Sequence, residues 1–183
     1  MKRVECPDSP MRASAFWKAV IVDDTNLLEE FVRLLETHGL RYCVIGGQAV
    51  NAYVEPLVSL DLDVVIAADQ AGRLPSILPA TYRQERFPHS LNLSKAGSDL
   101  RIQVQTDPRY ATFVTKATVR DVLGIRLPVA ALEDVLQGKI WAAADPARRG
   151  SKRQKDLADI ARILESFPHL TGVVPADILA RLT

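Results

Sequence analysis

The chain has 183 residues, of which 48% are hydrophobic and 25% are charged, the composition of an ordinary soluble protein able to bury one core. Its net charge of +1 excludes a general electrostatic attraction to nucleic acid or membranes, so any basic surface must be local. Two cysteines, Cys6 and Cys43, are too few for a disulfide framework, and the N-terminus lacks the apolar segment of a secretion signal. We therefore expect a cytoplasmic protein that makes no membrane contact.

The first half of the chain alternates between helical and strand-like patterns. Residues 1–14 carry two prolines and no hydrophobic period, so we expect a flexible arm there. After the arm, glycine and proline separate apolar residues at helical or alternating spacing. The expected elements are a helix over 26–38, a strand over 41–45, a turn at Gly46 and Gly47, a helix over 48–54, a strand over 60–67 and a short helix interrupted by Pro75.

The middle of the chain is rich in strand signals. Alternating runs over 90–94 and 100–106 predict a hairpin, with Gly97 in its turn. The runs over 118–123 and 125–129 predict a smaller hairpin around a glycine. These runs supply the remaining strands of a sheet.

The last part of the chain has a helical pattern. Apolar residues at helical spacing between 132 and 143, and again between 157 and 164, predict two helices. The order of elements indicates an α/β (α+β) fold, a mixed sheet flanked by helices. We expect the arm over 1–14, an α/β core over 15–130, and a helical segment over 131–183 packed on that core.

The segment VIGGQAVNAYVEPLVSLDLDVVI, residues 44–66, combines a glycine pair with two carboxylates on a strand. Side chains two residues apart on a strand share a face, so Ser59, Asp61 and Asp63 should project together. Adjacent carboxylates repel unless a cation joins them, and Mg²⁺ suits oxygen ligands. The glycines let a chain pass close, and the N–H groups that begin the next helix suit phosphates. The segment predicts a magnesium site beside a triphosphate.

This spacing resembles the signature of a known superfamily. The order Val44-Ile45-Gly46-Gly47, thirteen residues, then Asp61-Leu62-Asp63 is similar to that of the DNA polymerase beta-like nucleotidyltransferases. Ser59, two residues before the first aspartate, resembles a hydroxyl found in their abortive-infection (AbiEii-type) toxin branch. The likeness covers about residues 25–165.

A second block, LPVAALEDVLQGKIWAAADPARRGSKRQKDLADIARILE, resembles the C-terminal helices of the same branch. In that branch a lysine on one helix, here Lys139, and a Lys/Arg-Asp-x-x-Asp run on the next face the nucleotide. The corresponding run here is Lys155, Asp156 and Asp159.

The resemblance implies that a nucleoside monophosphate moves from an NTP to an acceptor hydroxyl, and that pyrophosphate leaves. The acceptor would be RNA such as tRNA, a protein or a small molecule, and the branch suggests a toxin with an antitoxin partner. The implied site residues are Asp61 and Asp63 as catalytic Mg²⁺ ligands, Lys139 as a catalytic cation, and Gly46, Gly47, Ser59, Gln103 and Lys155 around the nucleotide.

One position departs from the superfamily pattern. A later strand usually adds a third carboxylate, and in the matching strand LRIQVQTD that position is Gln103. An amide brings no negative charge and cannot act as a base at neutral pH. Asp99 and Asp107 each lie four residues away, about 13 Å along an extended strand. Three readings stay open: a site that works with two acids, a different strand alignment, and a loss of chemistry.

Each candidate also has a purely structural interpretation. Asp61 and Asp63 would aid solubility on an edge strand, although the apolar residues after them favour a buried one. Lys139 would be a lysine whose charged end reaches water from an apolar helix. Asp156 and Asp159 would lie on a solvent face or form ion pairs.

The region after the first C-terminal helix holds a cluster of cations. Such a cluster is either a solvated face or a guide for RNA or a triphosphate. Lys152 is in reach of Asp156, four residues further along a helix. Tyr110 is expected to be distant from the cluster, so no aromatic residue supports base stacking there. The cluster consists of Arg148, Arg149, Lys152, Arg153 and Lys155.

Two further functions therefore stand beside the enzyme. Gln103 is compatible with a degenerate member that binds nucleotide or RNA without chemistry. The C-terminal helices are compatible with an interaction module that docks a partner.

Overall fold

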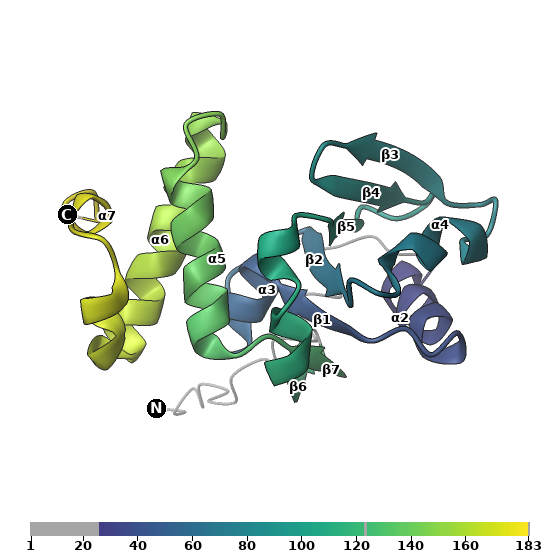
Figure 1. Ribbon diagram of the computed structural model, residues 1–183, viewed down its shortest axis with the longest axis horizontal. Helices are drawn as coiled ribbons and strands as arrows, with labels where there is room; N and C mark the ends of the chain where they lie inside the picture. The colour runs from purple at the N-terminus through teal and green to yellow at the C-terminus, as the bar shows by residue number, and fades with distance from the viewer. Residues whose placement is uncertain (1–25, 123, 183) are drawn as a thin grey trace, which may run out of the picture.

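The computed structural model describes residues 26–122 and 124–182 (Figure 1). The expected arm over 1–14 and Cys6 lie outside these residues. The helices are α2 Leu27–Thr37, α3 Gly46–Asn51, α4 Leu74–Ile77, α5 Leu132–Ala144, α6 Gly150–Ser166 and α7 Ala176–Leu179, with 3-10 turns η1 Ala71–Arg73, η2 Pro108–Tyr110, η3 Phe113–Lys116 and η4 Pro168–Val173. The strands are β1 Tyr42–Ile45, β2 Asp61–Ile66, β3 Arg83–Phe87, β4 Ser90–Ser94, β5 Arg101–Gln105, β6 Thr118–Val122 and β7 Ile125–Val129.

Within the described residues, seven strands form one mixed sheet in the order β3-β4-β5-β2-β1-β7-β6. Strand β2 runs parallel to β5 on one side and antiparallel to β1 on the other. The predicted mixed α/β fold with flanking helices is confirmed. Because β2 is paired on both sides, the edge-strand interpretation of Asp61 and Asp63 is wrong.

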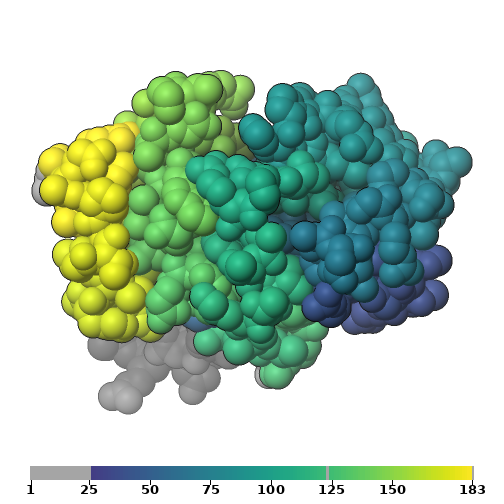
Figure 2. Space-filling view, viewed as in Figure 1, coloured from purple at the N-terminus to yellow at the C-terminus, as the bar shows by residue number. Residues whose placement is uncertain are grey.

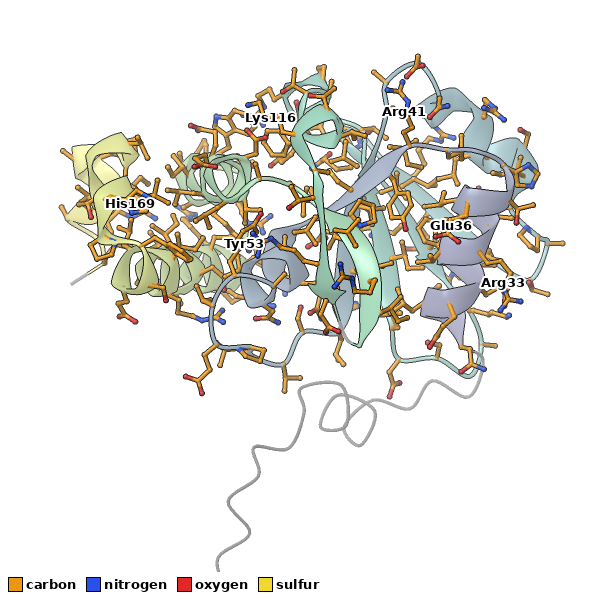
Figure 3. The ribbon with its side chains drawn as sticks, turned by 90° about the horizontal axis from the view of Figure 1, so that it is seen from below. Arg33, Glu36, Arg41, Tyr53, Lys116 and His169 are labelled. Atoms are coloured by element: carbon orange, nitrogen blue, oxygen red, sulfur yellow. The ribbon has the colours of Figure 1, made fainter. Side chains whose placement is uncertain are left out.

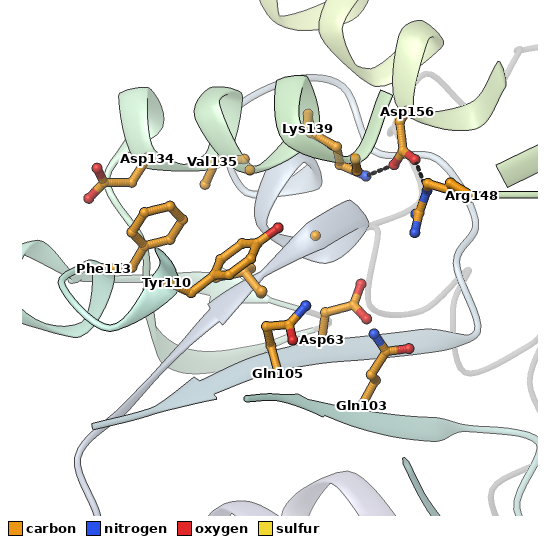
Figure 4. A pocket seen from close by; sticks show the side chains of 14 residues that line it. Asp63, Gln103, Gln105, Tyr110, Phe113, Asp134, Val135, Lys139, Arg148 and Asp156 are labelled. Atoms are coloured by element: carbon orange, nitrogen blue, oxygen red, sulfur yellow. Dashed lines mark hydrogen bonds and ion pairs between the residues drawn. The ribbon is translucent and has the colours of Figure 1, made fainter. Parts of the chain in front are cut away.

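Alternation along β2 and β5 divides the sheet into two faces. Leu62 and Val64 of β2 and Ile102 and Val104 of β5 are at most 2% exposed and belong to the hydrophobic core. Residues of opposite parity face the other way, so Asp63 projects from the other face of the sheet. Figure 4 shows α5 on the Asp63 side of these strands.

Helix α2 supplies much of the core. Asn26 precedes it with φ of 49°, a conformation that asparagine tolerates, and Gly39 follows its end with φ of 62°. Figure 3 shows Arg33 and Glu36 on α2, at the far end of the molecule from His169. The buried residues of α2, spaced as predicted, are Leu27, Leu28, Phe31, Val32 and Leu35.

Two helices differ from the sequence expectation. Helix α3 begins at Gly46, so the glycine pair forms its first turn. It ends at Asn51, before Pro56, because the Asn51 side chain bonds both the N–H and the C=O of Leu57 and turns the chain there. Pro75 does not interrupt α4, because it is the second residue of that helix and proline is tolerated in a first turn.

Strand β3 was not predicted. All five of its residues, RQERF, are exposed, so they show no alternation of apolar and polar residues. Strand β3 pairs with β4, and the two predicted hairpins, β4 with β5 and β6 with β7, are confirmed. Cys43 is a buried free thiol as expected, and burial raises its pKa to about 12, with a further contribution from Asp134.

The two predicted C-terminal helices are confirmed as α5 and α6, which pack against each other and against α3. Because α6 begins at Gly150, Lys152 and Lys155 lie on its first turns. The boundaries at residues 14 and 130 stay predictions. In the part of the chain that the structure describes, no helix is both long and apolar enough to cross a membrane.

Phe31 tests how much α2 contributes to the core. The substitution Phe31→Ala should lower the free energy of unfolding by about 3–5 kcal/mol, because it leaves a cavity beside the sheet. The exposed Arg33 on the same helix is the control, and Arg33→Ala should change the value by less than about 0.5 kcal/mol. Equilibrium urea unfolding measures both, and equal losses would contradict the packing described.

Candidate active site

Asp63 lies where β1 ends and α3 begins. The sheet pairs it with Ile45 on one side and with Gln103 on the other. Gly46 has φ of 67°, and a Cβ added there would lie 2.0 Å from Asp63 Oδ2. Only glycine combines this backbone conformation with so close an approach of the carboxylate.

The Asp63 carboxylate is surrounded by protein but retains some exposure, because it opens into a cavity. Burial raises its pKa above the usual value of 3.8, while the cation of Lys139 opposes this shift. Among the described residues, none donates a hydrogen bond to this carboxylate or forms an ion pair with it. The hydrogen-bonding capacity of its oxygens is therefore unused by these residues.

Asp61 lies two residues earlier on the same face of β2 and is held by two cations. Arg101, its register partner on β5, places Nε 3.2 Å from one carboxylate oxygen. Lys152 of α6 places Nζ 3.1 Å from the other. The expected pairing of Lys152 with Asp156 is wrong, because α6 turns Lys152 toward the sheet.

Three of the predicted nucleotide residues come together beside Asp61. Lys155 Nζ donates a hydrogen bond to Ser59 Oγ over 3.3 Å. A Cβ added to Gly47 would lie 3.4 Å from Ser59 Oγ and 3.8 Å from Lys155 Nζ. The first turn of α3, the residues before β2 and the second turn of α6 thus meet at one place.

Lys139 forms the centre of a buried charge network between α5 and α6. Its Nζ lies 3.0 Å from Asp156 Oδ1 and 2.6 Å from Asp159 Oδ2. Burial disfavours the charged amine, yet these carboxylates raise the pKa of Lys139 above its usual value. Asp156 also pairs with Arg148, and Asp159 pairs with Arg162 at 2.9 Å. Lys139 does not reach water, and the solvent-face interpretation of the two aspartates is wrong, whereas ion pairing holds.

The site residues line two pockets that share part of their lining and form two compartments of one site, the second of which is seen in Figure 4. The first, which we name the Lys155 compartment, is lined by Gly47, Ser59, Asp61, Lys152 and Lys155. The second, the Tyr110 compartment, is lined by Gln105, Tyr110, Phe113, Val135 and Gly138. Both are also lined by Asp63, Gln103, Lys139, Arg148 and Asp156.

The structure corrects one expectation and adds residues to the site. Tyr110 is not distant: η2 folds it over the strands, so it lines the same cavity as Asp63. Gln105 shares the strand parity of Gln103, a signal that the sequence carried. In Figure 2 the surface is hollowed between the green C-terminal helices and the teal strands β3 and β4.

The sheet register places Gln103 directly beside Asp63. That Gln103 stands at the position of the third carboxylate stays a prediction. Asp99 precedes β5, and Asp107 follows it and pairs with Arg109 at 2.7 Å. Over residues 26–122 and 124–182, no three His, Cys, Asp or Glu side chains group closely enough to hold a metal.

The donor set nevertheless fits Mg²⁺. This ion is commonly bound by one or two carboxylates, with waters and substrate phosphates completing the octahedron. Asp63 offers oxygens without a direct partner, and Asp61 already attracts two cations to the same place. The Gln103 amide oxygen is a neutral third donor.

Comparison with known proteins gives a structural answer. No protein-family model matches the chain, and no curated protein matches it. Solved structures do. The antibiotic-resistance factor ANT(2'')-Ia superposes with a TM-score of 0.60 at 14% identity, covering 85% of this chain and 90% of the other. The chain has a nucleotidyltransferase fold.

Two more structures share this fold. The lincomycin-bound lincosamide antibiotic adenylyltransferase LnuA gives a TM-score of 0.54 at 14% identity, over 78% of this chain and 99% of the other. An antigenic nucleotidyltransferase-like protein from Paracoccidioides brasiliensis gives 0.51 at 17% identity, over 79% and 78%. At these identities the likeness is one of fold, and the toxin branch stays a prediction.

The raised pKa of Asp63 predicts a pH-dependent gain in stability when its charge is removed. The folded state binds the carboxyl proton more tightly than the unfolded state, so deprotonation above pH 3.8 costs folding stability. Asp63→Asn should raise the thermal midpoint of the metal-free protein at pH 7, and this gain should fade as the pH falls toward 3.8. Asp61→Asn, which loses two ion pairs, should give no gain. An equal gain for both variants would contradict the site electrostatics.

Proposed function

We propose that this protein is a Mg²⁺-dependent nucleotidyltransferase that moves a nucleoside monophosphate from an NTP to a hydroxyl acceptor. The observation that carries the proposal is the placement of Asp61 and Asp63 on one face of an interior strand, in the same cavity as Lys152 and Lys155. Proteins of this fold include ANT(2'')-Ia, whose structure was solved in complex with adenylyl-2''-tobramycin. That neighbour supports nucleotidyl transfer as the chemistry of the fold.

Each site residue has a role in this reaction. Asp61 and Asp63 hold Mg²⁺, which when bound polarises the α-phosphate and steadies the leaving oxygen. Gly46 and Gly47 let the phosphates approach the start of α3. Lys152 and Lys155 exchange their contacts with Asp61 and Ser59 for phosphate oxygens, and so compensate charge that gathers on the leaving pyrophosphate.

The transfer breaks one bond and forms one. The acceptor oxygen bonds to the α-phosphorus, and the bond from that phosphorus to the bridging oxygen of the β-phosphate breaks. Pyrophosphate leaves with the electron pair. The acceptor proton passes to water, because the Gln103 amide can orient the hydroxyl by accepting its hydrogen bond but cannot take its proton.

The Lys139 network holds this arrangement in place. Asp156 and Asp159 compensate the Lys139 charge, and Asp156 also directs Arg148 to the cavity wall. Lys139 therefore supports the site as a catalytic cation whose field reaches the Asp63 carboxylate. Asp156 acts as a positioning residue for Arg148.

The acceptor that we propose is RNA such as tRNA, ahead of a protein hydroxyl. Arg101 and Lys152, which both pair with Asp61, are 63% and 43% exposed, and Lys152 follows closely on the cations of the α5–α6 connection. This local field favours a polyanion over a cationic antibiotic. Within the AbiEii-type branch, the protein would act in the cytoplasm as a toxin restrained by an antitoxin, with ATP as one candidate nucleotide.

Gln103 supports a second candidate, a nucleotide-binding protein without catalysis. A neutral residue beside Asp63 removes the carboxylate that commonly assists deprotonation of the acceptor. Binding and chemistry must therefore be measured separately.

Alanine at the carboxylates tests the metal site. Pyrophosphate release with each NTP, Mg²⁺ and bulk tRNA should fall by at least about 100-fold in Asp61→Ala and in Asp63→Ala, because charge stabilisation of the transition state is lost. Asp69→Ala, which breaks an exposed ion pair, is the matched control and should keep the wild-type rate. Retained activity in either site variant would contradict the proposal.

Restoring the third carboxylate separates the enzyme from the degenerate binder. In an active site limited by Gln103, Gln103→Glu should raise the rate of pyrophosphate release by about 10- to 100-fold, since it adds a base beside Asp63. Gln103→Met preserves side-chain length without charge and should give no increase. NTP binding by wild type, with no release from wild type or from Gln103→Glu, would favour the second candidate.

A further inference from the structure

We propose that the Tyr110 compartment receives the nucleobase of the NTP, and that Gln105 selects the base through one fixed hydrogen-bond donor. This inference rests on the proposed nucleotidyl transfer. It concerns a residue outside the signature of the superfamily and assigns it a role in specificity.

The orientation of the Gln105 amide is fixed by the backbone. Its Oε1 accepts hydrogen bonds from the N–H groups of Thr106 at 2.9 Å and Asp107 at 3.1 Å. An NH₂ group could not accept these bonds, so the network assigns the amide oxygen to the loop. The Nε2 group consequently faces the cavity (Figure 4), and no described residue accepts a hydrogen bond from it.

The compartment around this donor has flat aromatic walls. The Tyr110 ring packs edge-on against Phe113 at 5.1 Å and Trp141 at 5.3 Å, which hold it rigidly in place. A Cβ added to Gly138 would lie only 3.2 Å from Tyr110 Cε1, so the glycine brings the ring against α5. Burial raises the pKa of Tyr110 to about 12, so its phenol stays neutral.

Apart from Asp63 at its border, the charged side chains that line this compartment have ion-pair partners. Lys139 and Arg148 are bound by Asp156. The Asp134 carboxylate points away from Asp63 (Figure 4), and it forms an ion pair with Lys116 at 3.4 Å. In the Lys155 compartment, by contrast, Lys155 donates its hydrogen bond to the neutral hydroxyl of Ser59. A triphosphate suits the Lys155 compartment, and a planar uncharged ring with hydrogen-bonding edges suits the Tyr110 compartment.

The two compartments meet at the reacting position. Asp63 and Gln103 line both, so a nucleotide whose α-phosphate lies at Asp63 can extend its phosphates to one side and its base to the other. Gln105 lies two residues beyond Gln103 on the same strand face, about 7 Å further along β5. This separation matches the step from an α-phosphate across a ribose to a base.

A fixed N–H donor discriminates by rejecting bases that present a donor at the same position, because two donors leave both unpaired. Gln105→Glu tests this directly. The carboxylate keeps an oxygen for the Thr106 and Asp107 amides and replaces the cavity donor with an acceptor. The variant therefore keeps the contacts to the loop, whereas it disfavours the bases that the Gln105 donor favours.

The experiment is isothermal titration of the full chain with Mg²⁺ and each of ATP, GTP, CTP, UTP and inorganic tripolyphosphate, which has no base. We expect wild type to bind one NTP more tightly than tripolyphosphate. In Gln105→Glu the ratio of these two affinities should fall by about 3- to 10-fold for the preferred NTP. Using the ratio removes the general effect of one added negative charge on phosphate binding.

Tyr110 gives an independent variant pair. Tyr110→Phe keeps the ring and should keep the ratio within about twofold, whereas Tyr110→Leu should lower it, with thermal midpoints checking that each variant is folded. Unchanged ratios in both Gln105→Glu and Tyr110→Leu would overturn the inference and leave the proposed function standing. If the variants changed only the choice of acceptor in the pyrophosphate-release assay, the compartment would hold the acceptor, and the inference about the base would be overturned. Failure to bind any triphosphate would overturn both proposals.

Discussion

The contact between Gly46 and Asp63 is the constraint on which the site depends. The Asp63 carboxylate occupies the space that a Cβ of residue 46 would need. Because Gly46 has no Cβ and adopts a positive φ, α3 can start directly at the end of β1 with this carboxylate against its first residue. This brings the first turn of a helix to an acidic strand in the interior of the sheet. The arrangement buries negative charge without a direct partner, which raises the pKa of Asp63 and favours binding of a cation.

The Lys139 network fixes the opposite wall. A buried ion pair gains little net stability over an apolar contact, but removal of one partner strands a charge at a cost of about 3–5 kcal/mol. Lys139, Asp156 and Asp159 therefore specify one way of packing α5 against α6. That packing directs Lys152 and Lys155 at the sheet, so an interaction between two helices decides which cations face Asp61 and Ser59.

The cavity joins two chemical environments around Asp63. Lys152 and Lys155 of α6 and Gly47 of α3 line one compartment, and the Gln105 amide with the Tyr110 and Phe113 rings lines the other. A nucleotide has the same division, with charged phosphates at one end and a flat base at the other. The neutral Gln103 beside Asp63 distinguishes this site from one with three acids.

Local sequence determined the elements that bury regular apolar faces. The 3.6-residue period of α2, α5 and α6, and the alternation in β2, β4 and β5, were readable because each element packs one face on the core. Strand β3 carried no such signal, since all its residues are exposed. Among the site residues, parity placed Asp61 and Asp63 together, and the strand alignment placed Gln103 beside them.

Only the tertiary structure decided the long-range partners. The pairing of Lys152 with Asp61 joins residues 91 positions apart, and the placement of Tyr110 beside Asp63 depends on how η2 folds over the strands. The burial of Lys139 and Asp159 likewise requires two helices to meet, and neither helix alone shows that these charges face inward. Sequence periodicity reports which face of an element is apolar, whereas the partner of a polar side chain is set by the packing of elements that are distant in the chain.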